Sequence, residues 1–221
     1  MSKIEGILKT RRDFYAFLCR MYLEEPAREL ADDLVNGRIF LPDQRALELN
    51  ADLSAGFREL REFMERSKGK TVDELQEELR DEYTRLFILP HGHSVQPYES
   101  WWIEGKLMGS SLLKVKSEYR EAGIAKSRDY PELDDHIAFE LKFMQYLCEE
   151  ELSATDNNER MLECLNLQKE FFDEHLLKWV PAFCDGLYEW ETSKFFKSIA
   201  KITKGFILLD AHVIGELLET V

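Results

Sequence analysis

The chain has 221 residues, of which 44% are hydrophobic and 12% aromatic, a composition that supplies a packed core and excludes a largely disordered protein. Its 43 acidic and 29 basic residues give a formal net charge of −14, which repels nucleic acid and anionic membranes and favours basic partners. No stretch reaches the roughly 20 apolar residues of a membrane-spanning helix, so we expect no membrane insertion. The four widely spaced cysteines, without a Cys-x-x-Cys pair, predict reduced and mostly buried thiols.

The first predicted element is a helix near residues 3 to 23. It includes the stretch "TRRDFYAFL", which is similar to a twin-arginine export signature built around Arg11 and Arg12. Arg20 and Glu24 interrupt the apolar segment that an export signal needs, and no small-residue cleavage site follows. We therefore expect an amphipathic helix with both arginines in solvent, in a protein that stays in the cytoplasm. The side chains predicted to face the core are Phe14, Leu18, Met21 and Tyr22.

The next elements are also predicted to be helices, because apolar residues recur at three- and four-residue intervals without the alternation typical of strands. A helix near 26 to 36 ends at Asn36-Gly37, a left-handed stop signal, and another spans 52 to 66. The stretch "TVDE" at 71 to 74 fits a capping box that opens a further helix, which must end before Pro90.

The second half of the chain continues the helical pattern. Helices are predicted near 104 to 121, 135 to 152, 157 to 178 and 195 to 219, with a loop through Pro131 and a break at Pro181. No Pro/Gly/Ser-rich linker divides the sequence. We therefore predict one all-α domain over residues 1–221, a bundle of roughly nine helices.

One stretch interrupts this pattern, "LPHGHSVQPYESWW" at 89 to 102, and it raises the question of a metal site. His91 and His93 lie two residues apart, but His136, His175 and His212 lie far away along the chain. A helical di-iron site needs Glu-x-x-His pairs, and the sequence has none. We expect no metal and no other cofactor.

The same stretch raises the question of catalysis. The "GKT" at 69 to 71 lacks the first glycine of a phosphate-binding loop, since Met64 occupies that position. Ser100, Ser110 and Ser111 could take part in a nucleophile pair, but nothing in their surroundings demands it. We expect a protein that is not an enzyme. Two alternatives stay open: a small all-α enzyme that uses a loop with His91, His93 and Ser100, and a general helical adaptor.

Recognition is the third interpretation of this stretch. Tyr98, Trp101 and Trp102 offer large, rigid apolar faces of the kind found in binding hot spots, and Glu99 lies among them. The stretch "YPELDDH" at 130 to 136 adds three carboxylates, which are also ordinary caps at a helix start. If the two stretches meet, they form an acidic aromatic groove suited to arginine, which pairs with carboxylates and stacks on rings.

Four blocks of the sequence resemble the TorD/DmsD family of cytoplasmic redox-enzyme maturation chaperones. They are "YTRLFILP" at 83 to 90, "PYESWW" at 97 to 102, "DDHIAFELKFM" at 134 to 144 and "FFDEHLLKWVPAF" at 171 to 183. Each block alone could be helix packing. The four occur in the family's order over about 83 to 183, which makes the resemblance specific.

The resemblance implies a helical chaperone that binds the twin-arginine signal peptide of a molybdopterin oxidoreductase subunit. It would hold the apo-form of that subunit back from export until the molybdenum cofactor is inserted. Either a monomer or a domain-swapped dimer is compatible with the family. By the same resemblance, the peptide-binding groove would consist of Tyr98, Glu99, Trp101, Trp102, Pro131, Asp134, Asp135 and His136.

His136 has two interpretations at this point. A histidine beside two carboxylates would have its charged form favoured, which would make His136 a pH-sensitive contact of the groove. Alternatively, it donates a hydrogen bond at the helix end.

Overall fold

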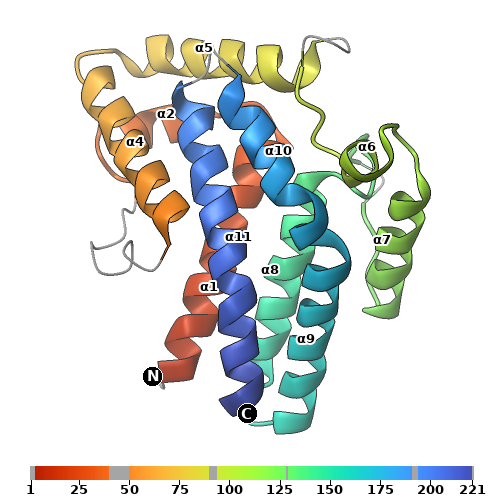
Figure 1. The fold of residues 1–221 in the computed structure, drawn as a ribbon. Helices are drawn as coiled ribbons and strands as arrows, with labels where there is room; N and C mark the ends of the chain where they lie inside the picture. The colour runs from red at the N-terminus through yellow and green to blue at the C-terminus, as the bar shows by residue number, and fades with distance from the viewer. Residues whose placement is uncertain (1–2, 40–49, 90–93, 128, 191–193, 221) are drawn as a thin grey trace. The chain divides into compact units, whose positions relative to one another are not determined.

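The computed structural model describes residues 3–39, 50–89, 94–127, 129–190 and 194–220 (Figure 1). Regular structure within these ranges is helical, which confirms the predicted all-α class. The α-helices are α1 (Lys3–Leu23), α2 (Arg28–Val35), α4 (Ala51–Ser67), α5 (Val72–Tyr83), α6 (Glu99–Glu104), α7 (Ser110–Glu121), α8 (Ile137–Ser153), α9 (Asn158–Phe171), α10 (Leu177–Glu189) and α11 (Lys194–Thr220). Two π-helical segments, η1 (Thr84–Ile88) and η2 (Phe172–Leu176), continue α5 and α9 directly.

Local sequence signals set several helix ends as predicted. Thr71 Oγ1 accepts a hydrogen bond from the Glu74 backbone N–H at 3.2 Å, and Glu74 Oε2 accepts one from the Thr71 N–H at 2.8 Å, which completes the capping box of α5. Gly37 follows α2 with a φ of 66°, a conformation that glycine adopts without steric cost.

All four cysteines are buried free thiols. In the described residues, no helix combines the length and apolarity required to cross a bilayer.

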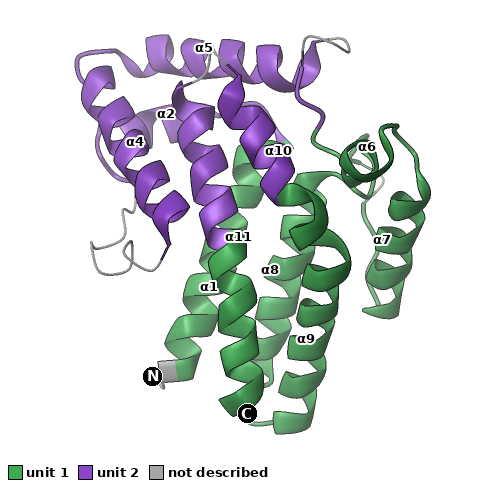
Figure 2. Ribbon diagram, viewed as in Figure 1, with its two compact units in different colours: residues 1–23, 97–180, 207–221 green, residues 24–96, 181–206 purple. Residues whose placement is uncertain are grey.

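The chain divides into two compact units (Figure 2). Unit 1 comprises residues 1–23, 97–180 and 207–221, and unit 2 comprises residues 24–96 and 181–206. In unit 1, α1 packs along α8, α8 packs on α9, and α6 packs on α7. In unit 2, α2 packs on α4 and α5. The boundaries fall inside α10 and α11, so each of these helices contributes to both units.

Unit 2 contains a close approach of two backbones that requires glycine. A Cβ atom built on Gly205, in α11, would lie 2.3 Å from the backbone nitrogen of Leu53 in α4. Gly56 lies against α11 in the same way, where its Cβ would be 2.7 Å from the Ile202 backbone nitrogen. Each glycine lets α4 and this part of α11 approach more closely than any other residue would allow.

Two predicted helix boundaries were wrong. The helix expected over 104 to 121 begins only at Ser110, as α7, and the residues before it form a separate helix that was not predicted, α6, which ends at Gly105 with a φ of 69°. The break expected at Pro181 is absent, since Pro181 lies inside α10. An interior proline costs about 3 kcal/mol, and full burial of one large apolar side chain contributes about 1.5–3 kcal/mol. The neighbouring Trp179, Val180 and Phe183 are all fully buried, so the helix continues.

The expected position of Arg11 was also wrong. Its side chain is buried in unit 1, where Nε lies 2.7 Å from Asp210 Oδ1 and Nη1 lies 3.0 Å from Glu151 Oε2. Arg12, by contrast, is half-buried and forms an ion pair with the adjacent Asp13. Arg11 occupies the same helix face as the buried Tyr15, four residues later. Its carboxylate partners come from α8 and α11, so no local pattern in α1 reveals them. Leu18, Met21 and Tyr22 are buried as predicted, whereas Phe14 is half-buried.

Candidate functional site

The two stretches that the sequence singled out meet inside unit 1. Tyr98 and His136 form an isolated antiparallel bridge. The Glu99 N–H donates to the Asp135 carbonyl at 3.0 Å, and the Ile137 N–H donates to the Pro97 carbonyl at 2.9 Å. These hydrogen bonds join the start of α6 to the start of α8. The meeting that the recognition interpretation required is therefore present in the structure.

The side chain of Asp135 connects the start of α6 to the start of α8 through a buried hydrogen bond. Its Oδ2 atom accepts a hydrogen bond at 2.9 Å from the backbone N–H of Ser100, in the first turn of α6. A carboxylate at this position satisfies a backbone donor that the helix cannot pair itself. Both Asp135 and Ser100 are fully buried. Asp135 thus holds α6 against α8 and does not face solvent.

His136 is a buried helix cap, not the pH-sensitive contact considered above. Its Nδ1 atom accepts a hydrogen bond from the Ala138 N–H at 3.1 Å, and its ring lies edge-on to Tyr98 with 5.1 Å between the centroids. Burial, with a smaller contribution from Lys126, lowers the pKa of His136 to about 3. The imidazole is therefore neutral at physiological pH, and its Nδ1 is an acceptor where a donor was expected.

A second histidine, His175, contacts Glu99, the first residue of α6. Its Nδ1 atom lies 2.8 Å from Glu99 Oε2, and its Nε2 atom lies 2.8 Å from Glu118 Oε1 in α7. Burial alone would lower the pKa of His175, but hydrogen bonds and charge attraction from Glu118 and Glu99 raise it to about 9. The charged imidazolium therefore links η2 to both α6 and α7, and it neutralises the buried Glu99.

Glu140 completes this buried polar network. Trp179 Nε1 donates to Glu140 Oε2 at 2.9 Å, and both side chains are fully buried. Burial raises the pKa of Glu140 well above its ordinary value, and the nearby Glu99 raises it further. Three buried oxygen atoms in this region have no hydrogen-bond partner among the described residues: Ser100 Oγ, Asp135 Oδ1 and Glu140 Oε1. The described residues therefore leave part of this buried network without hydrogen bonds.

The accessible part of the junction is aromatic and acidic. Tyr98, Trp101 and Trp102 are half-buried, as are Glu132 and Asp134, and Pro131 is exposed. The Tyr98 hydroxyl donates to the Glu132 carboxylate. Asp134 Oδ2 lies 3.9 Å from Lys116 Nζ, at the outer limit of an ion pair. These side chains are partly exposed to solvent, whereas Glu99, Asp135 and His136 are buried.

His175, Glu118 and Glu140 were not predicted as members of the site. Glu140 and His175 lie in two of the four blocks that carried the family resemblance, next to apolar residues of their helices. The sequence offered one signal for Glu140 and His175: each is a polar, ionisable residue on a helix face that is otherwise apolar and faces the core. Their partners are remote in sequence, with 76 residues between Glu99 and His175, so the pairing required the structure.

The structure gives no support for the enzyme alternative. His91 and His93 lie outside the described residues. Ser100 is fully buried, which removes it from reach of a substrate. Over the described ranges, no group of three or more His, Cys, Asp or Glu side chains is arranged to hold a metal ion.

Comparison with known proteins gives the family. A family model described as "Nitrate reductase delta subunit" matches residues 47–185. The chaperone protein TorD of Vibrio cholerae serotype O1 is 24% identical over 224 residues, covering 99% of this chain and 98% of the relative. TorD of Photobacterium profundum is 29% identical over 150 residues, covering 66% and 69%.

Solved structures also match. One of them is a protein from Archaeoglobus fulgidus described as a redox enzyme maturation protein, with 21% identity, a TM-score of 0.49, and coverage of 90% of this chain and 93% of that one.

The chain belongs to the nitrate reductase delta subunit family, and TorD chaperones are among its relatives. The curated relatives are named as chaperones, a non-enzymatic role. This agrees with the expectation that the protein is not an enzyme. The family resemblance of the four sequence blocks is thereby confirmed.

Proposed function

We propose that this protein is a cytoplasmic chaperone that binds the twin-arginine signal peptide of a molybdopterin oxidoreductase subunit. By holding the apo-form of that subunit, it delays export until the molybdenum cofactor is inserted. The observation that carries the proposal is the junction of residues 97–102 with residues 132–136. Tyr98, Trp101 and Trp102 lie at the start of α6, Glu132 and Asp134 lie just before α8, all five are half-buried, and Tyr98 donates a hydrogen bond to Glu132.

Arginine is the side chain that this junction suits best. A guanidinium group has five N–H donors in a plane, pairs with carboxylates in a bidentate manner, and stacks on aromatic rings. Glu132 and Asp134 supply the carboxylates, and Tyr98, Trp101 and Trp102 supply the rings. Lysine lacks both the planar fork and the stacking face, so a twin-lysine peptide should bind less well.

The buried residues of the predicted groove have a supporting role in this proposal. Glu99, Asp135 and His136 position α6 and α8, and their removal would act through the fold as well as through the ligand. Asp135 Oδ1 and Ser100 Oγ are buried and have no hydrogen-bond partner in the described part of the chain.

Isothermal titration calorimetry tests the proposal. A synthetic twin-arginine signal peptide should bind the wild-type protein at least tenfold more tightly than the same peptide with two lysines in place of the arginines. Two bidentate contacts worth more than 1.4 kcal/mol in sum suffice for that ratio.

Variants locate the binding site. Trp101→Ala with Trp102→Ala should weaken arginine-peptide binding by more than tenfold, and Glu132→Gln with Asp134→Asn should reduce the preference for arginine over lysine. The matched controls are Trp190→Ala, a half-buried tryptophan in unit 2, and Glu170→Gln, an exposed acid on α9. Equal binding of both peptides, or equal losses in controls and site variants, would refute the assignment.

A further inference from the structure

The α6–α7 hairpin, residues 99–121, exposes apolar side chains on its outer side. Met108 is 72% exposed, Leu113 is 69% exposed and Ile103 is 46% exposed. Side chains with such exposure project from the surface and do not line a groove. Three large apolar groups on one short segment mark an interaction surface more strongly than scattered single residues do.

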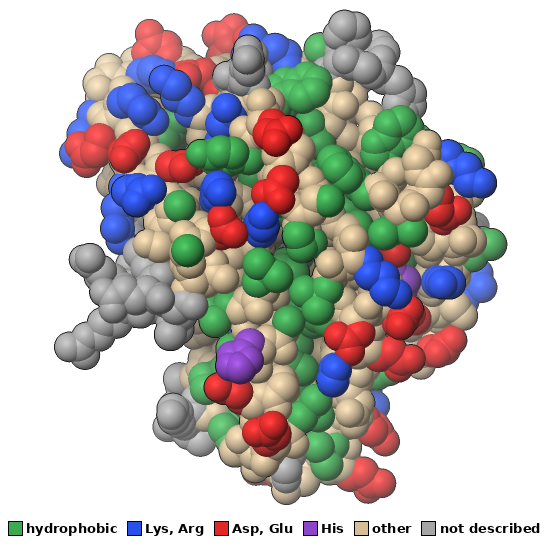
Figure 3. Space-filling model, viewed as in Figure 1, with side chains coloured by type: hydrophobic (Ala, Val, Ile, Leu, Met, Phe, Trp, Pro, Cys, Tyr) green, Lys and Arg blue, Asp and Glu red, His purple; other side chains and the backbone are tan. Residues whose placement is uncertain are grey.

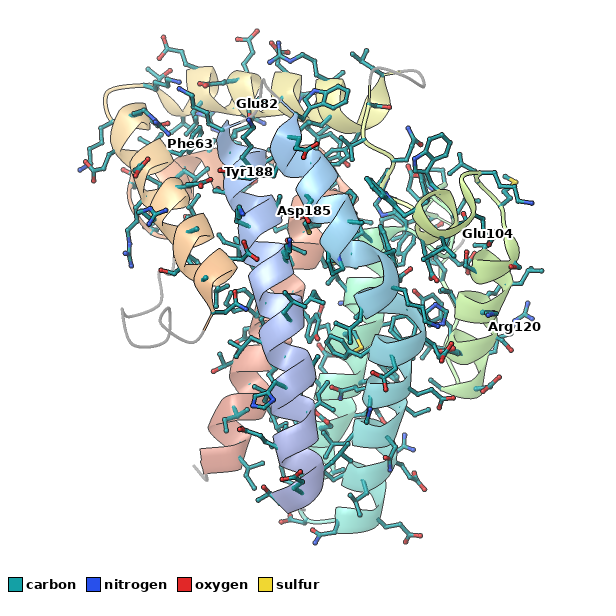
Figure 4. The ribbon with its side chains drawn as sticks, in the orientation of Figure 1. Phe63, Glu82, Glu104, Arg120, Asp185 and Tyr188 are labelled. Carbon is teal, nitrogen blue, oxygen red and sulfur yellow. The ribbon has the colours of Figure 1, made fainter. Side chains whose placement is uncertain are left out.

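The connection between the two helices is held in a defined conformation. Glu104 Oε1 accepts hydrogen bonds at 2.9 Å from the Ser111 N–H and at 2.9 Å from the Ser111 hydroxyl. Figure 4 shows Glu104 directed into the space between α6 and α7. A Cβ atom on Gly109 would lie 2.3 Å from Glu104 Oε1, so a larger residue there would displace this carboxylate from its hydrogen bonds to Ser111. Met108 itself has a φ of 59°, an uncommon conformation for a residue with a side chain. The segment that exposes Met108 therefore has a defined conformation, fixed by these contacts.

The same hairpin carries cations that lack carboxylate partners. Lys106, Lys114 and Arg120 are exposed, and none of them lies within 4.0 Å of a carboxylate oxygen among the residues that the structure describes. Lys114 acts on Glu174 only through longer-range charge attraction. Figure 4 shows Arg120 directed away from the rest of unit 1. Cations of α9 are paired, by contrast: Arg160 with Glu150 and Glu163, and Lys169 with Asp173. Over α6 and α7, Figure 3 shows hydrophobic side chains next to Lys and Arg, with acidic side chains among them.

We propose that the α6–α7 hairpin docks on an anionic lipid surface, with Met108, Leu113 and Ile103 in the interfacial region and Lys106, Lys114 and Arg120 against the headgroups. A bilayer interface accepts projecting apolar side chains and meets each cation without a fixed geometry. A protein partner would need a matching acidic cavity. The formal charge of −14 does not prevent local attraction, because charges more than about 8 Å away are largely screened at physiological salt. Docking of this kind is peripheral.

Co-sedimentation with vesicles tests the proposal on the full chain. The wild-type protein should bind vesicles of mixed phosphatidylcholine and phosphatidylglycerol, and should not bind phosphatidylcholine alone. Replacement of Lys106, Lys114 and Arg120 by Gln should reduce binding by at least tenfold. The matched control replaces Arg20, Arg58 and Arg66 by Gln, since these three cations are also exposed and unpaired within the described residues.

A second variant tests the apolar contribution separately. Met108→Asn with Leu113→Ser removes both projecting apolar groups, and asparagine tolerates the left-handed backbone of residue 108. This variant should reduce vesicle binding by at least fivefold without a change in the far-ultraviolet circular dichroism spectrum. Three results would each overturn the proposal: no binding of the wild type to anionic vesicles, equal losses in the control triple variant, or full binding by the apolar variant. Absence of vesicle binding would point to an acidic protein surface as the occupant.

Discussion

Two histidines of the candidate site have opposite protonation states, although both are buried. Burial without a carboxylate partner lowers the pKa of His136 to about 3, whereas Glu118 and Glu99 raise the pKa of His175 to about 9 in spite of burial. The difference arises from partners that are remote in sequence. His175 therefore contributes charge to the site, and His136 contributes a neutral acceptor.

The raised pKa of His175 predicts a loss of stability at alkaline pH. Because the folded state binds the proton more tightly than the unfolded state does, the contribution of His175 is fully present below pH 6.5 and is lost as the pH rises through about 9. Urea unfolding of the wild type should show this decline, and His175→Gln should flatten it. His212→Gln, which alters a histidine with a 75% exposed side chain, serves as the control and should leave the decline unchanged.

The lowered pKa of His136 predicts the opposite dependence. Its contribution is present above pH 6.5 and is lost as the pH falls toward about 3, because protonation favours the unfolded chain. His136→Asn keeps a side-chain acceptor at the helix start but has no titrating group. This variant should unfold at a lower pH than the wild type in an acid titration followed by circular dichroism, and an unchanged acid midpoint would contradict the assignment.

At the level of single residues, the sequence predicted which segments form the candidate site. It did not predict which of their acidic side chains face solvent and which are buried. Residue type shows that Glu99, Glu132, Asp134 and Asp135 can all bind arginine. Whether each one faces solvent or the interior depends on packing of α6 against α8, which no local pattern encodes. The buried partners of Glu99 became visible only in the structure.

The first helix shows how adjacent residues of one element take different roles. Arg11 in α1 connects to α8 and α11 through Glu151 and Asp210, and to α9 through a hydrogen bond to Gln168. Arg12 has only the neighbouring Asp13 as its ion-pair partner in the described structure. The resemblance of this pair to an export signature is thus a coincidence of composition on a helix with one inward-facing arginine.

This difference predicts unequal effects of two matched substitutions. Arg11→Ala leaves two buried carboxylates without their cation and should lower the free energy of unfolding by about 3–5 kcal/mol. Arg12→Ala removes an exposed ion pair between neighbours and should change it by less than about 0.5 kcal/mol. Urea unfolding monitored by circular dichroism gives both values. Similar values for the two variants would contradict the buried position of Arg11.

Helix positions were largely predicted and helix interruptions were not. The capping box of α5 and the glycine after α2 depend on residues three or four apart, so the sequence reveals them. The continuation of α10 through Pro181 depends on burial of its neighbours, so tertiary context overrides a local rule there. The end of α6 at Gly105, by contrast, follows a local glycine signal that the prediction did not use.

For the whole molecule, if the chain is one domain, as predicted, it should unfold in a single cooperative transition. Trp101, Trp102 and Trp179 lie in unit 1 and Trp190 lies in unit 2, and α10 and α11 run through both units. In a Trp190→Phe variant, tryptophan emission reports unit 1 alone, while far-ultraviolet circular dichroism reports all helices. The two urea curves should coincide, and separated midpoints would show that the units unfold independently.

The central claim is that the arginines of a client signal peptide lie against the junction of residues 97–102 with residues 132–136. A twin-arginine peptide with a photo-crosslinking residue beside the arginine pair tests it directly, with adducts located by mass spectrometry. The account predicts adducts on Tyr98, Trp101, Trp102 or residues 130–134, and their loss when excess unlabelled twin-arginine peptide is present. Adducts confined to unit 2, or equally abundant with a twin-lysine peptide, would contradict it.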